Sequence, residues 1–408
     1  MASLRASSPL ETALAARAGG LPPFRAAAFE SFSRLGLPHR RLEGWRWSDF
    51  GAALRDAAPV PATIHETSPA LADDLAALRP IELRIVNGRI DIPADAFPEG
   101  VRCGIIDAVG TIPELETNPI AALNVAMTKK ALGIEIAERV ELPQPILIRH
   151  VNTGAGFSFA QCLLRLCDGA RATLIETFEG GGAAFHSHLF HLVLRDGARL
   201  DRALIDETGS EAVVHSIFAP KIEGRAHLNQ TSLSFGARLA RHETHAHFLG
   251  AGGEAEISSA ALLSGGRHSD FTSEVVFIGE GCKTRQRHKG VAKDTGRNVF
   301  QGKFRVRRGA QKTDAGMNAD ALLLSDLAES NSKPELEIYA DDVQCAHGST
   351  SGALDAEALF YMRQRGLTEH RARAMLIEAF VASAFDHVAH PGIGEAFRRR
   401  VAKWLEDA

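Results

Sequence analysis

Hydrophobic and polar positions follow three different patterns along the chain. Between residues 141 and 350, short alternating stretches are separated by Gly, Asp and Asn, which predicts β-strands joined by tight turns. Residues 1–140 have the pattern of helices and loops, with Trp45 and Trp47 expected to pin a small helical subdomain. Residues 351–408 have a helical pattern. We therefore predict an N-terminal, mostly helical domain, a β-rich core and a C-terminal helical domain.

The β-rich segment contains an approximate repeat. Leu-Arg-Leu-Cys-Asp-Gly-Ala-Arg at 164–171 recurs as Leu-Val-Leu-Arg-Asp-Gly-Ala-Arg at 192–199, with a looser copy at 304–311 and a fragment at 233–238. Each copy alternates apolar residues and then reaches a glycine, which permits a sharp corner. One such unit cannot bury its apolar side alone, but stacked units form a continuous core. The repeat alone favours equally a parallel β-solenoid and a large sandwich or jelly roll.

The C-terminal segment carries helix signals. Asp355 is a suitable N-cap for a first helix, and Thr368 for a second one. In the second helix, apolar residues recur at helical spacing from Ala372 to Phe380. This stripe packs on the β core or docks another chain, and we expect removal of residues 351–408 to leave a folded core.

Composition narrows the range of functions. Of 408 residues, 45% are hydrophobic and 24% charged, the balance of a folded globular protein. The net charge of −4 gives little support for nucleic-acid binding. No apolar run approaches the roughly 18 residues of a membrane span, and the N-terminus lacks the apolar core of a signal peptide. Five cysteines without a Cys-x-x-Cys pair indicate neither a disulfide framework nor a zinc finger, so we expect a cytoplasmic protein.

The sequence lacks the motifs of an enzyme that acts alone. It has no Gly-x-Ser-x-Gly nucleophile elbow and no Gly-x-x-x-x-Gly-Lys-Ser/Thr phosphate loop. The glycine-rich stretches 180–182 and 250–253 are not followed by the lysine and helix that a phosphate cradle needs. We therefore predict that the chain is not an enzyme and that a partner meets any ATP requirement.

Two groups of histidines are candidates for metal binding. Alternate residues of a strand face the same side, so each group offers a pair of imidazoles that could hold zinc, copper or iron. Neither group has a complete set of metal ligands, and stacked strands also produce such ladders without metal. We predict structural roles for both and keep a homodimeric metal-binding solenoid as the alternative function. The groups are His186, His188 and His191, and His242, His245 and His247.

The strongest local signal is Tyr-Ala-Asp-Asp-Val-Gln-Cys-Ala-His-Gly-Ser-Thr at residues 339–350. Cys345 and His347 lie two residues apart, so both can face the same side of a strand. Thiolate and imidazole both suit iron, but a cluster normally takes about four protein ligands, so the others would come from another chain. The pair alone leaves open metal handling and a buried Cys and His at a strand end.

This segment and the residues after it closely resemble the C-terminal signature of the SufB/SufD family of the SUF iron–sulfur cluster assembly machinery. The D subunits are the more similar, because the chain is short, lacks a Cys-rich N-terminal motif and has His-Gly-Ser-Thr where B subunits have His-Glu-Ala-Thr. Ser349 stands where alanine is commoner in D subunits. The matching segments are Cys-x-His-Gly at 345–348, Leu-Phe-Tyr at 359–361, Arg-Gly at 365–366, Ala-Arg-x-Met-Leu at 372–376, and upstream 38–49, 285–290 and 300–303.

The resemblance implies a right-handed parallel β-helix core between N-terminal and C-terminal helical regions, which favours the solenoid. It implies a scaffold that pairs with SufB through the core and binds the SufC ATPase through its C-terminal helices, with a homodimer possible for the isolated chain. A nascent cluster or iron would be held at the SufB–SufD interface, with His347 as a ligand and Cys345 beside it. We then expect the isolated chain to bind no cofactor stably, and iron or cluster to be transient in the complex.

Overall fold

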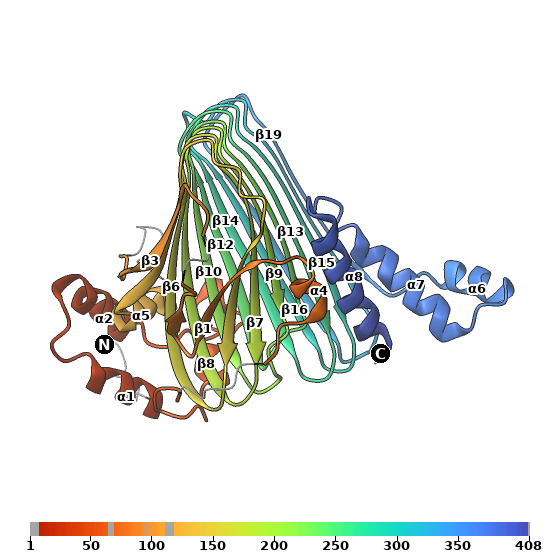
Figure 1. Ribbon diagram of the computed structural model, residues 1–408. Coiled ribbons are helices and arrows are strands. Elements are labelled where there is room, and N and C mark those ends of the chain that lie inside the picture. The colour runs from red at the N-terminus through yellow and green to blue at the C-terminus, as the bar shows by residue number, and fades with distance from the viewer. Residues whose placement is uncertain (1–7, 64–68, 95–96, 111–117, 407–408) are drawn as a thin grey trace.

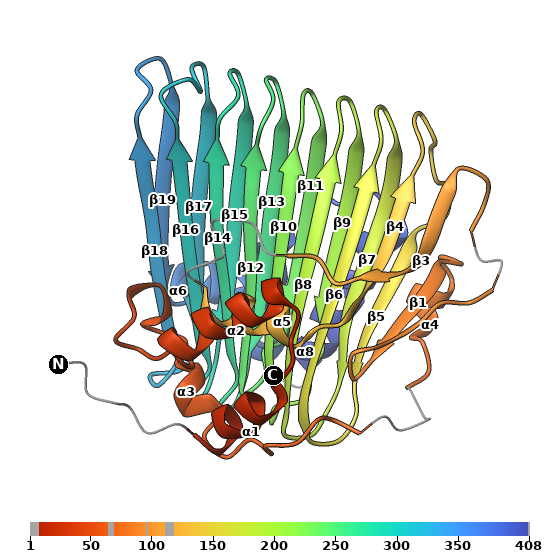
Figure 2. The same cartoon turned by 90° about the vertical axis from the view of Figure 1, so that its left-hand side faces the viewer.

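The structure, a computed structural model, describes residues 8–63, 69–94, 97–110 and 118–406. Most of these residues form a parallel β-solenoid made of two sheets (Figures 1 and 2). Helices from the two ends of the chain cover opposite sides of the solenoid (Figure 1). The predicted fold class, a parallel β-solenoid with flanking helices, is confirmed.

The chain alternates between the two sheets, so odd-numbered strands from β5 onward build one and even-numbered strands the other. Neighbouring strands are parallel except for the antiparallel pairs β1–β2 and β3–β4. The first sheet contains, in order, β19 (Gln344–Gly352), β17 (Asp314–Leu323), β15 (Lys283–Ala292), β13 (Glu254–Leu263), β11 (His227–Ser234), β9 (Arg199–Asp206), β7 (Arg171–Gly180), β5 (Ile146–Asn152), β1 (Ile81–Val86) and β2 (Arg89–Asp91). The second contains β18 (Glu329–Ile338), β16 (Arg297–Val306), β14 (His268–Phe277), β12 (Leu239–Phe248), β10 (Val213–Ile222), β8 (Ala184–Leu194), β6 (Gly156–Leu166), β4 (Lys130–Ile136) and β3 (Val101–Asp107).

The sequence repeat marks one corner of the solenoid, where an even strand leads into the next odd strand. Gly169 and Gly197 adopt φ values of 68° and 66° there, a conformation that favours glycine. The amide of Gly169 donates to the carbonyl of Asp196 on the next turn at 2.9 Å, which stacks the corners. The looser copy at 304–311 lies at the same corner, whereas the fragment at 233–238 lies at the opposite one, between β11 and β12.

The N-terminal helices lie on the outer face of the even-numbered sheet (Figure 2). Strands β8, β10 and β12 are therefore buried on both faces, with the solenoid interior on one side and helices on the other. Strands β1 to β4 extend both sheets into the first 140 residues. These helices are α1 (Pro9–Arg17), α2 (Pro23–Leu35), η1 (Glu43–Trp45), α3 (Phe50–Ala53) and α5 (Pro119–Met127), whereas α4 (Asp73–Ala76) lies on the odd-numbered sheet beside the C-terminal helices (Figure 1).

Three C-terminal helices follow the solenoid: α6 (Ala356–Gln364), α7 (Glu369–Ala382) and α8 (Pro391–Glu406). The predicted N-caps are confirmed. The side chain of Asp355 accepts hydrogen bonds from two backbone amides of α6, and the side chain of Thr368 accepts one from a backbone amide of α7. Helix α8 packs on the odd-numbered sheet, whereas α6 projects away from it and buries none of its residues (Figure 1). Among the described helices, none combines the length and apolar character needed to span a membrane.

The face of α7 that packs on the solenoid differs from the predicted stripe. Its buried residues are Ala372, Ile377 and Val381, whereas Met375 is 40% exposed. Together with α8, the buried face covers apolar side chains of the odd-numbered sheet. This argues against removing residues 351–408 as a unit, because the truncated solenoid would expose that apolar surface.

Candidate functional site

The solenoid has an open end at β18 and β19, the last strands of the two sheets (Figure 2). Each of these strands pairs along one edge, and its other edge has no partner strand within the described chain. Val343 and Leu336 lie at this end and are half-buried against the apolar interior. An unpaired sheet edge beside a half-covered core is a surface onto which another chain can add strands.

The structure places Cys345 and His347 on β19, in register with Ala315 and Met317 of β17. Those two β17 residues belong to the solenoid interior, so the Cys-x-His pair aligns with the inward-facing columns at the open end. His347 is exposed, whereas Cys345 is half-buried against the core. Burial, with a smaller contribution from Asp314, raises the pKa of the Cys345 thiol, so it is protonated at neutral pH.

A line of contacts connects α7 to the strand that carries His347. The ammonium of Lys289 lies 4.7 Å from the ring centre of Phe380 on α7 and 2.8 Å from the carboxylate of Asp320 on β17. Asp320 in turn accepts a hydrogen bond from the hydroxyl of Thr350 on β19 at 2.5 Å. The sequence contains no local signal for this line, because its members come together only through strand register.

One group of three buried side chains in the described chain has the spacing of metal ligands: His150, Glu176 and His188. Oε1 of Glu176 lies 3.2 Å from Nε2 of His150 and 3.9 Å from Nδ1 of His188. Its other oxygen binds the guanidinium of Arg202 at 2.6 Å. Burial alone would raise the pKa of Glu176, but Arg202 and His150 hold it below its usual value, so the group is a carboxylate.

Because Arg202 already neutralises Glu176, a divalent ion would add two uncompensated charges to the solenoid interior. Burying charge without a counter-charge is costly. Burial also holds the pKa of His188 well below its ordinary value, so this imidazole is neutral, and its Nε2 lies 3.4 Å from the Cys162 sulfur. The arrangement is better suited to a hydrogen-bonded network than to an ion.

The remaining inward-facing histidines of the two predicted groups also have protein partners. Nδ1 of His186 lies 2.7 Å from the hydroxyl of Ser158. His242 lies 2.7 Å from the hydroxyl of Ser216 and 3.0 Å from the carboxylate of Asp206. These contacts support the structural roles predicted from the sequence.

Outward-facing residues of β12, the strand that carries the second histidine group, help to hold the N-terminal segment. Glu243 faces away from His242, as expected on a strand. Its carboxylate accepts a hydrogen bond from the guanidinium of Arg241 at 2.9 Å. The same carboxylate lies 2.7 Å from Nε2 of His215 and 2.8 Å from Nε2 of His245. Arg241 in turn stacks 4.1 Å from the ring centre of Trp45. Sequence reasoning missed this network because His215 lies one solenoid turn before Glu243.

We expect the double change His186→Gln and His188→Gln to lower the free energy of unfolding by about 1–3 kcal/mol, because both imidazoles are buried and make polar contacts. Cluster yield per folded complex should stay unchanged. Chemical unfolding and cluster absorbance, measured on the same preparation, check the two parts separately. A collapse of cluster yield in a folded variant would assign these histidines a functional role.

Comparison with known proteins agrees with this geometry. The family model described as "SUF system FeS cluster assembly, SufBD core domain" matches residues 149–380. The iron-sulfur cluster assembly protein SufD of Escherichia coli (strain K12) is 29% identical over 388 residues, covering 91% of this chain and 90% of that protein. The chloroplastic protein ABCI7 of Arabidopsis thaliana is 25% identical over 430 residues, covering 98% of this chain and 90% of that protein.

The family match runs from β5 into α7 and includes the open end with Cys345 and His347. It spans more than half of the chain, and the similarity to SufD extends over nearly all of it. The chain therefore belongs to the SufBD family of the SUF iron–sulfur cluster assembly system and is of the SufD type.

Proposed function

We propose that this chain is a non-catalytic scaffold subunit that pairs with SufB, binds the SufC ATPase and holds iron or a nascent iron–sulfur cluster at the SufB–SufD interface. The observation that carries the proposal is the open end of the solenoid, where the exposed His347 lies on a strand with one unpaired edge. Cluster reconstitution on the three-subunit complex with His347→Asn tests it.

The open end supports pairing with a second solenoid. A solenoid needs a cap at each end, because the last turn cannot bury its inner face alone. Strand addition across β18 and β19 would satisfy their free backbone groups and cover Val343 and Leu336. A homodimer through the same edges is the corresponding expectation for the isolated chain.

The side chains of β19 explain why a nascent cluster would need ligands from two subunits. His347 offers an exposed imidazole, a suitable ligand for iron. Cys345 is half-buried and protonated at neutral pH, so it is a poor ligand until a base or a metal removes its proton. Since a cluster takes about four ligands, the partner would supply the remaining ones. The cluster would be bound only transiently and then transferred.

The projecting part of the C-terminal region is the surface we assign to SufC. Phe360 and Tyr361 of α6 are 64% and 59% exposed, and Met375 of α7 is 40% exposed. Large aromatic side chains that protrude from a surface are typical anchors of protein interfaces. The opposite face of α7 and the buried face of α8 pack on the solenoid and are unavailable to a partner.

We expect Phe360→Ser combined with Tyr361→Ser to weaken SufC binding by about 30-fold or more, the effect of removing interface anchors. The melting temperature should stay near the unchanged protein's, because neither side chain is buried. A pull-down with purified SufC measures retention, and Phe24→Ser on α2, also an exposed aromatic at 48%, is the matched control. Full retention by the double variant would remove α6 from the interface.

A further inference from the structure

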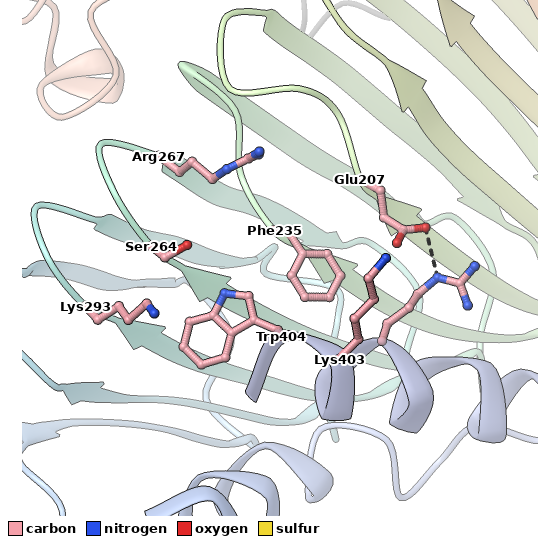
Figure 3. Close-up of a pocket in the computed structure, with 8 residues that line it drawn as sticks. Glu207, Phe235, Ser264, Arg267, Lys293, Lys403 and Trp404 are labelled. Atoms are coloured by element: carbon pink, nitrogen blue, oxygen red, sulfur yellow. Dashed lines mark hydrogen bonds and ion pairs between the residues drawn. The ribbon is translucent and has the colours of Figure 1, made fainter. Parts of the chain in front are cut away.

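A hollow of about 270 Å³ lies between α8 and one corner of the solenoid (Figure 3). The solenoid contributes Phe235, Ser264 and Lys293, which follow the ends of three successive odd-numbered strands. The helix contributes Lys403 and Trp404 to the same hollow. The size is close to the lower end of the roughly 300–1,000 Å³ of known ligand sites, so the hollow suits a small molecule.

Ion pairs of a buried arginine fix the helical wall of this hollow. Arg400 of α8 is buried and binds the carboxylates of Glu207 at 2.9 Å and Asp74 at 2.5 Å. The guanidinium is thereby committed to two carboxylates, and it holds α8 against the solenoid. The wall is preformed, which lowers the entropic cost of binding a ligand.

The other basic side chains of the lining give the hollow a positive charge. Besides Arg400, it is lined by Arg267, Lys293 and Lys403, and Glu207 is the one carboxylate among the eight residues that line it. Arg267 is held in place because it donates to the carbonyls of Thr208 at 2.8 Å and Gly236 at 2.5 Å. A concave surface lined by one sign of charge attracts ligands of the opposite sign.

Two aromatic rings form the apolar part of the hollow. Figure 3 shows Phe235 and Trp404 side by side, with Lys293 reaching toward them from one side and Lys403 from the other. The ammonium of Lys293 lies 5.5 Å from the ring centre of Trp404, which orients the lysine along the indole. The arrangement thus combines cations with flat apolar surfaces, as sites for small amphipathic anions do.

We propose that this hollow binds a small aromatic anion, whose ring lies against Trp404 and Phe235 and whose phosphate or carboxylate group pairs with one of the two lysines that flank these rings, Lys293 or Lys403. The site is distant in the sequence from β19 and contains none of the residues assigned to cluster handling. Its ligand would therefore bind whether or not the proposed role of His347 holds.

Calorimetric titration of the full-length chain at low salt tests the site with phenyl phosphate, benzoate and uncharged benzyl alcohol. We expect saturable binding of at least one of the two anions, about tenfold tighter than that of benzyl alcohol, and weakening as salt is added. The tighter of phenyl phosphate and benzoate identifies the preferred oxyanion. Equal binding of benzyl alcohol, or no saturation by either anion up to about 10 mM, would overturn the proposal.

The double change Lys293→Gln and Lys403→Gln should weaken anion binding by about tenfold or more while preserving the melting temperature. The control is Lys283→Gln with Lys312→Gln, which removes the same charge from exposed lysines near the other end of the odd-numbered strands. Equal weakening in both double variants would show only a general effect of net charge and would overturn the assignment to this hollow.

Discussion

His347→Asn is expected to fold and to bind both SufB and SufC, yet to lose most of its cluster formation. Asparagine keeps the approximate size and polarity of the side chain, but its amide is a poor ligand for iron. His347 is exposed on an edge strand, so the change should alter the free energy of unfolding by no more than about 0.5 kcal/mol. Cluster absorbance of the reconstituted complex, normalised to complex concentration, measures the effect.

Two further measurements distinguish a ligand from an interface contact. If His347 only forms a hydrogen bond to the partner, the variant will change the affinity of the complex and leave the cluster yield per complex intact. Cys345→Ser should have the milder effect, because the Cys345 thiol is protonated at neutral pH and a thiolate of the partner can supply the sulfur ligand of the cluster. Normal assembly with a normal yield would exclude His347 from cluster handling.

Acidification from pH 7.5 to 5.5 should destabilise the isolated chain strongly. Burial lowers the pKa of His186 to about 3, and of His191, His268 and His288 to about 4. In the unfolded chain, these imidazoles titrate near pH 6.5. Below that pH the unfolded chain binds protons that the folded chain does not bind. The free energy of unfolding therefore decreases as the pH falls and recovers above about pH 6.5.

The size of this effect follows from proton linkage. Each of the four histidines costs about 1.4 kcal/mol at pH 5.5, and together they cost about 6 kcal/mol, a large share of typical folding stabilities of about 5–15 kcal/mol. Chemical unfolding at the two pH values measures the loss. His268→Gln with His288→Gln should reduce the loss of stability by about 3 kcal/mol, whereas His370→Gln, at an exposed position on α7, should leave it unchanged. Equal stability at both pH values would contradict the prediction.

Features that depend on neighbouring residues were predictable from the sequence alone. The corners at Gly169 and Gly197 repeat the same few residues, because each corner needs a glycine with positive φ in the same local setting. Asp355 and Thr368 cap their helices through bonds to amides two or three residues away. The resemblance to the SufB/SufD family then decided between a solenoid and a sandwich, which the repeat by itself left open.

Tertiary structure decided what depends on residues one or more turns apart. Glu243 meets His215 because β10 and β12 are neighbours, and α7 buries Ile377 because the solenoid covers that side of the helix. The hollow beside Trp404 needs successive strand ends and a helix more than a hundred residues later in the chain. Local propensity operates over a few residues, whereas strand register and helix docking join distant ones. For that reason the sequence by itself determined the corners, the caps and the Cys345–His347 motif, and only the fold placed that motif on an open edge.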